Sequence, residues 1–140
     1  MKINKITVIS TAMILAVLVL AACSSGGSSG GSSGGTSVTV TTTEFAFTPS
    51  DITVPAGATV NLTLKNTGSV EHTWVILKQG VDVTSATGLD QASIVFSSKV
   101  AAGQTANFTF TAPSAAGDYQ IICDLPGHLE GGMKGTLTVK

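Results

Sequence analysis

Near the C-terminus of this 140-residue chain, a thiol, an imidazole and a thioether follow one another at equal spacing. Cys123, His128 and Met133 lie five residues apart, so one loop could turn all three side chains toward one point. The chain has one other histidine, His72, which lies beside a predicted strand. Together these residues offer two imidazoles, a thiolate and a thioether, which is a set of donors for a metal ion.

This donor set favours copper. Imidazole suits both oxidation states of copper, and thiolate and thioether are soft donors that favour Cu(I). A site of two histidines and one cysteine with a weak axial methionine is typical of electron-transfer copper centres. Zinc is the alternative because it also binds cysteine and histidine, but its usual sites do not use a thioether. We therefore predict one copper ion bound by His72, Cys123, His128 and Met133.

After residue 37 the chain has the pattern of half-buried β-strands. Apolar residues alternate with polar ones, and threonine and valine are abundant. Residues 74–77 and 121–122 are apolar on both parities, as expected of central strands covered on both faces. Residues 80–92 fit neither period and are expected to form one short excursion that is irregular or helical. The alternating segments contain Val38/Val40, Ile52/Val54, Val60/Leu62/Leu64, Phe108/Phe110 and Leu137/Val139.

About seven short strands without a long amphipathic helix predict an all-β fold, a two-sheet antiparallel β-sandwich with Greek-key connections. Residues 38–140 have the usual size of one domain. A sandwich could bring His72, beside the strand at 74–77, to the same end as the loop 123–133. The four donors would meet at that end.

The first 22 residues have the pattern of a secretory signal. Lys2 and Lys5 precede an apolar run, and small residues lead to Cys23. This segment resembles the lipobox of bacterial lipoproteins, in which the cysteine is lipidated and becomes the N-terminus. An uncleaved anchor helix is the alternative, because the run 6–22 is barely long enough to span a bilayer. Residues 23–37 are then the lipidated Cys23 and a Gly/Ser tether, and the domain lies outside the cytoplasm.

The single cysteine of the predicted exported domain, Cys123, is unusual. Exported domains usually pair their cysteines as disulfides or have none. If Cys23 carries lipid, Cys123 has no cysteine partner. A single cysteine is otherwise commonly a small buried apolar residue, but that explanation leaves the joint spacing of the donors unexplained.

Charge and histidine content argue against two classes of function. The chain after Cys23 has five lysines, no arginine and eight carboxylates, and nucleic-acid binding needs a basic face. Catalytic copper usually needs further imidazoles and an open position, and one site already uses both histidines, so we expect no enzyme activity. Copper delivery stays an alternative, although delivery favours exposed donors and Cys123 follows two apolar residues.

The donors and their neighbours resemble the small blue (type 1) copper proteins of the cupredoxin family, in particular the auracyanins and azurins. The resemblance rests on the spacing Cys-x4-His-x4-Met with Pro-Gly before His128, the ending Met-Lys-Gly-Thr-Leu-Thr-Val and the upstream His-Thr-Trp-Val. It implies the same four copper ligands and, as partners, redox proteins of a membrane electron-transport chain. Thr73 stands where family members often have an asparagine that braces the ligand loop.

We also expect a docking surface around His128. One edge of its ring should face solvent, framed by Leu125, Pro126 and Leu129, because an apolar patch around a functional edge marks an interaction site. Weak redox encounters use small interfaces. The sequence as a whole therefore predicts a monomeric electron carrier, anchored through Cys23 to the outer, periplasmic-side face of a bacterial cell membrane.

Overall fold

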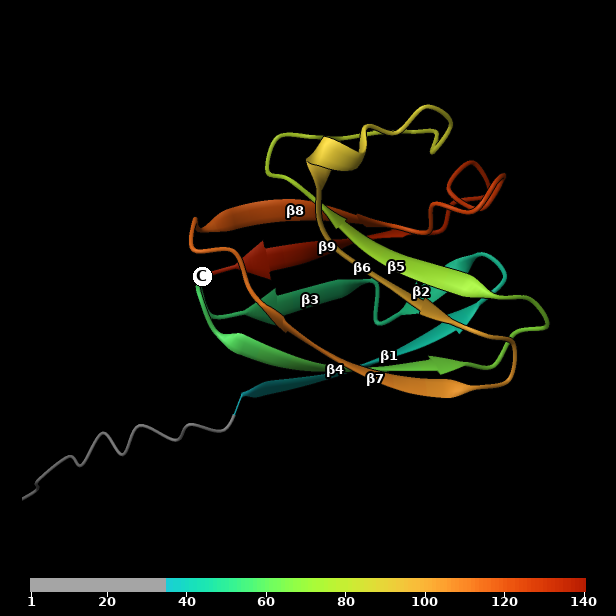
Figure 1. Ribbon diagram of the computed structural model, residues 1–140, viewed down its shortest axis with the longest axis horizontal. Helices are drawn as coiled ribbons and strands as arrows, with labels where there is room; N and C mark the ends of the chain where they lie inside the picture. The colour runs from blue at the N-terminus through green and yellow to red at the C-terminus, as the bar shows by residue number, and fades with distance from the viewer. Residues whose placement is uncertain (1–34) are drawn as a thin grey trace, which may run out of the picture. The chain divides into compact units, whose positions relative to one another are not determined.

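The computed structural model describes residues 35–140 (Figure 1). The predicted signal, Cys23 and nearly all of the tether lie outside the described residues. No helix in the described part has the length and apolar character needed to cross a bilayer.

Nine strands form two sheets that pack face to face, and residues 35–140 contain no α-helix. One sheet has the strand order β2-β1-β4-β7 and the other β3-β9-β8-β5-β6. The prediction of an all-β, two-sheet sandwich is therefore confirmed. The strands are β1 (Thr36–Thr43), β2 (Ala46–Thr48), β3 (Asp51–Val54), β4 (Thr59–Asn66), β5 (His72–Leu77), β6 (Ile94–Val100), β7 (Thr105–Thr111), β8 (Gly117–Ile122) and β9 (Lys134–Val139).

The sheets are mixed rather than antiparallel as predicted. β1 pairs with β4 in parallel, and β3 pairs with β9 in parallel. After the short β2, the chain crosses to the other sheet for β3 and returns as β4, so β4 runs beside β1 in the same direction. Alternation with a period of two is common to both kinds of pairing, so the sequence pattern could not give the strand direction.

One further strand and one strand boundary also differ from the prediction. β6 was not predicted, because the buried position Ser98 interrupts its apolar alternation; the Ser98 hydroxyl donates to the carbonyl of Trp74 at 3.2 Å. β1 begins two residues before the predicted domain start, since Thr36 and Ser37 already pair with β4. The tether therefore ends earlier than residue 37.

Apolar side chains cover both faces of β5, and all six of its residues are buried. Trp74 and Ile76 face the core between the sheets. Val75 and Leu77 face a second apolar cluster beneath the segment 81–94. β5 lies between β8 and β6, as predicted for an apolar run on both parities. The excursion is irregular as predicted and ends in a single 3-10 turn, Gln91–Ser93.

The pairing of β5 with β8 brings the predicted donors together. The two strands are antiparallel, with Val75 opposite Ile122. The start of β5 and the end of β8 therefore lie at the same end of the sandwich, where the loop 123–133 and the β1–β2 turn also lie (Figure 1). Two core strands thus fix the backbone at His72 and Cys123.

Candidate metal site

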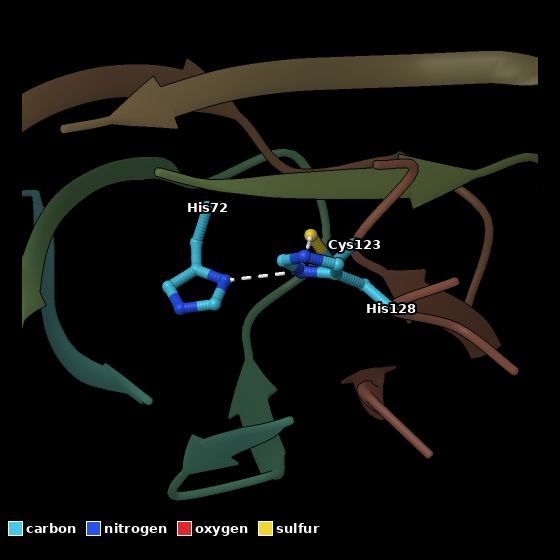
Figure 2. Close-up of side chains that lie close together, drawn as sticks. All are labelled: His72, Cys123 and His128. Carbon is cyan, nitrogen blue, oxygen red and sulfur yellow. Dashed lines mark hydrogen bonds between the residues drawn. The ribbon is translucent and has the colours of Figure 1, made fainter. Parts of the chain in front are cut away.

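The side chains of His72, Cys123 and His128 converge at this end of the sandwich (Figure 2). The Nδ1 atoms of the two histidines are 3.3 Å apart. The Sγ atom of Cys123 is also 3.3 Å from Nδ1 of His128. Donors that share one metal ion at about 2.0–2.3 Å lie within about 4.6 Å of one another, so both separations fit a single ion.

Burial favours the neutral form of His72, which is the form that binds a metal ion. Its side chain is fully buried, and this burial, followed by the nearby His128, lowers the pKa of His72 below its usual value. The neutral imidazole, which binds metals, is therefore favoured. Nδ1 of His72 faces Nδ1 of His128, which in turn faces the Cys123 sulfur. With Nδ1 as the ligand atom, the proton of the neutral His72 ring is on Nε2. The lone pairs that face one another at this point would all be satisfied by one shared cation.

The loop that carries the other donors is closed by its own backbone. The Cys123 N–H donates to the Met133 carbonyl at 3.1 Å, and the Met133 N–H donates to the His128 carbonyl at 3.0 Å. Gly127 and Gly132 have φ values of 81° and 100°, which glycine adopts without strain. Met133 is fully buried in the core beside Cys123. The loop thus holds the predicted axial thioether near the three converging donors.

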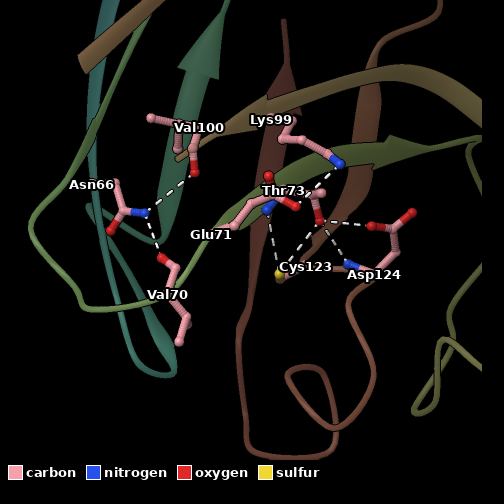
Figure 3. Close-up of polar contacts among 8 residues, drawn as sticks. All are labelled: Asn66, Val70, Glu71, Thr73, Lys99, Val100, Cys123 and Asp124. Atoms are coloured by element: carbon pink, nitrogen blue, oxygen red, sulfur yellow. Dashed lines mark hydrogen bonds and ion pairs between the residues drawn. The ribbon is translucent and has the colours of Figure 1, made fainter. Parts of the chain in front are cut away.

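Thr73 contacts the cysteine sulfur directly (Figure 3). Its N–H donates to Cys123 Sγ at 3.4 Å, and its Oγ1 lies at the same distance from Sγ. The hydroxyl is closer to Asp124, whose Oδ1 lies at 2.7 Å and whose N–H donates to it at 2.9 Å. A hydroxyl has a single proton, and the shorter contact directs it to the Asp124 carboxylate. Thr73 therefore joins β5 to the ligand loop, and the sulfur keeps one backbone N–H donor.

The predicted docking residues do not all lie at the surface. Pro126 is exposed and Leu125 is half-buried, but Leu129 is only 4 % exposed. Leu129 packs in the second apolar cluster with Val75, Leu77 and Ile122. The prediction that Leu129 frames a docking surface is therefore wrong. An irregular loop has no period from which the inward-facing residues can be read.

Phe45 lies beside His128, a contact that the sequence did not predict. Its ring makes an edge-to-face contact with the His128 ring, with centroids 5.2 Å apart and planes at 83°. The Phe45 side chain is 44 % exposed. Phe45 belongs to the β1–β2 turn, far from His128 in the sequence, so only the fold brings them together.

Comparison with known proteins identifies the family. A family model described as a cupredoxin-like domain matches residues 11–139. Auracyanin-A of Chloroflexus aurantiacus is 42 % identical over 146 residues, covering 83 % of this chain and 89 % of auracyanin-A. The solved structure of auracyanin A, described as a "blue" copper protein from the same organism, aligns with a TM-score of 0.67 and 32 % identity over 76 % of this chain and 100 % of that one.

A reduced auracyanin from Roseiflexus castenholzii gives a similar result. It aligns with a TM-score of 0.65 and 33 % identity, covering 75 % of this chain and 97 % of that chain. The family model covers nearly the whole chain, and the donors that converge at the end of the sandwich are of the types that suit copper. This chain belongs to the cupredoxin family, and its cofactor is copper.

Proposed function

We propose that this chain is a one-electron carrier with a single type 1 copper centre. The ligands are the Nδ1 atoms of His72 and His128, the thiolate of Cys123 and, as the axial ligand, the thioether of Met133. The convergence of a fully buried thiol with two imidazoles, at separations of 3.3 Å, is the observation that carries the proposal. Copper held by this donor set supplies a Cu(II)/Cu(I) couple, which takes one electron from a donor protein and gives it to an acceptor.

The frame around the donors suits this role. His72 starts β5, and Cys123 directly follows β8, so two paired core strands hold them in place. The Thr73 N–H donates to the Cys123 sulfur and partly offsets its negative charge. Of the three converging donors only His128 is partly exposed. Electrons therefore pass between the site and a partner through the edge of the His128 ring.

Burial of the thiol favours a carrier over a copper-delivery protein. Delivery requires a ligand that an incoming protein can reach and replace, whereas Cys123 has no exposed surface. A catalytic copper would also need an open position and usually further imidazoles, and the sequence has only two histidines.

The visible spectrum of residues 24–140, the exported chain without Cys23, loaded with Cu(II), tests the proposal. We expect an intense blue band from thiolate-to-copper charge transfer, which ascorbate bleaches and ferricyanide restores without a change in copper content. A colourless Cu(II) product would contradict the proposed ligand set. A blue product that loses its copper on reduction would favour delivery over electron transfer.

We propose redox proteins of a membrane electron-transport chain as the partners. They would dock on the surface around His128 formed by Phe45, Leu125 and Pro126, of which Phe45 and Pro126 are exposed. A small apolar surface with a redox-active edge suits brief encounters. Because the four proposed ligands come from one chain, we propose that the monomer is the active form.

We further propose that lipidated Cys23 holds the domain at the outer face of a bacterial cell membrane. The Gly/Ser tether before β1 would give it a reach of about 20 Å. In a bacterial host, we expect the full chain to fractionate with membranes, to incorporate labelled palmitate and to be cleaved before Cys23, and Cys23→Ser to lose both the label and the cleavage. A wild-type chain that stays in membranes unlabelled and uncleaved would indicate an anchor helix. A soluble, unlabelled wild-type chain would contradict anchoring.

A further inference from the structure

The β1–β2 turn places two adjacent residues against the two histidines of the site. β1 ends at Thr43 and β2 begins at Ala46, so Glu44 and Phe45 alone form the turn. Neither residue belongs to the donor set. Glu44 contacts the segment that precedes His72, and Phe45 contacts the ring of His128.

The carboxylate of Glu44 accepts three hydrogen bonds from the segment before His72. Its Oε1 accepts from the Ser69 N–H at 2.5 Å, the Ser69 hydroxyl at 3.0 Å and the Val70 N–H at 3.1 Å. A Cβ atom on Gly68 would lie 2.7 Å from both carboxylate oxygens, so the fit is close. Hydrogen bonds from its own backbone N–H and from that of Ser69 lower the pKa of Glu44 to about 2. The acceptor is therefore ionised at neutral pH.

Asn66 holds the same segment from the other side (Figure 3). Its Nδ2 donates to the carbonyls of Val70 at 2.7 Å and Val100 at 3.3 Å, and its Oδ1 accepts from the Gly68 N–H at 2.8 Å. The Asn66 side chain is buried. Glu44 and Asn66 together fix the backbone up to two residues before His72, and so fix the point from which its imidazole reaches the site.

Phe45 acts on the second histidine through its ring. Edge-to-face contact is a preferred geometry for aromatic pairs, and it covers one side of the partly exposed His128. Phe45 also fits closely against the ligand loop, because a Cβ atom on Gly131 would lie 2.9 Å from its Cγ. His128 is the one of the three converging donors with exposed surface, and the Phe45 ring lies against it.

We propose that Glu44 and Phe45 are positioning residues that brace both histidines, Glu44 through the backbone before His72 and Phe45 through the ring of His128. The inference rests on the proposed function, since those imidazoles are the ligands of its copper. The brace holds the two Nδ1 atoms at their observed separation and slows the outward rotation of His128 that would release the metal.

The rate at which excess EDTA removes copper from the exported chain, followed by loss of the blue band, tests the brace. We expect Phe45→Ala to raise the rate about three- to tenfold and Glu44→Gln to raise it at least about threefold. Phe45→Tyr keeps the ring and should behave as wild type. Val95→Ala removes an exposed apolar side chain from β6, and Glu71→Gln removes a carboxylate that pairs with Lys99 on the surface; both controls should stay within about twofold of wild type.

Nuclear magnetic resonance of the metal-free chain gives a second readout that does not depend on copper. We expect wild type to show an Overhauser contact between the rings of Phe45 and His128, and Phe45→Ala to show a His128 ring that samples several rotamers. A His128 ring as ordered in Phe45→Ala as in wild type would overturn the brace, whether or not the protein binds copper.

The same variants separate failure of the brace from failure of the proposed function. A blue wild type with variants that release copper at the wild-type rate would overturn the brace and leave the electron carrier standing. A colourless wild type would overturn the copper ligand set. The order of the His128 ring in the metal-free chain, compared between wild type and Phe45→Ala, would then support or overturn the brace. Faster copper loss that only follows a lower unfolding temperature of the metal-free chain would mean general destabilisation, and would also overturn the brace.

Discussion

Replacing Cys123 with serine is expected to abolish the intense visible band of the Cu(II) protein. The band requires a thiolate on copper, and a serine hydroxyl is a hard donor that stays protonated at neutral pH. The fold should survive, because serine is similar in size and the Thr73 N–H, now 3.4 Å from the sulfur, can donate to the new oxygen. The measurement is the visible absorption of equal amounts of variant and wild type after loading with Cu(II).

Met133→Leu is the matched control for this substitution. It removes the proposed axial thioether from a fully buried position and keeps the volume nearly constant. The thiolate stays, so the blue band should stay as well. A Cys123→Ser protein as intensely coloured as wild type would show that the thiolate is not a copper ligand.

A carboxylate at position 129 is expected to lower the free energy of unfolding of the metal-free domain by at least about 3 kcal/mol. Leu129 is 4 % exposed and packs against Val75, Leu77 and Ile122. Leu129→Asp would lose these contacts and bury an unpaired charge. Denaturant unfolding measures the effect. A stability within about 0.5 kcal/mol of wild type would contradict the burial of this side chain.

A carboxylate at the exposed Pro126, in the same loop, should act differently. Pro126→Glu should leave stability within about 0.5 kcal/mol of wild type. It should slow electron self-exchange between oxidised and reduced copies about tenfold, because two like charges would meet where the His128 edges approach. Pro126→Ala controls for the loss of the rigid ring. Self-exchange as fast in Pro126→Glu as in Pro126→Ala would contradict the docking surface.

The sequence predicted those parts of the fold that a periodic pattern records. Alternation predicted the sandwich, and the double-sided apolar run predicted the burial of β5. Strand direction leaves no mark in alternation, so the parallel pairs of β1 with β4 and β3 with β9 were not foreseen. β6 was missed because Ser98 faces inward, where its hydroxyl bonds to the backbone of β5.

For the site, the sequence predicted which residues could bind a metal ion, but not which way the other side chains around them point. The types and spacing of Cys123 and His128 indicated a metal loop, and the structure brings both together with His72. The burial of Leu129 depends on how the loop turns and on the segment that covers it. The roles of Glu44 and Phe45 depend on contacts between segments distant in the sequence, and neither residue type is distinctive by itself.

The backbone hydrogen bonds of the ligand loop bear on the order of folding and metal binding. Cys123 and His128 are both tied to Met133 by main-chain atoms alone, so the loop can close before any ion arrives. We therefore expect folding to finish without the ion, and metal binding to follow as a separate, bimolecular step. Because Cys123 and His72 have no exposed surface and His128 is partly exposed, an incoming ion meets His128 first. The residue proposed to pass electrons outward would thus also be the first ligand that copper meets in the metal-free protein.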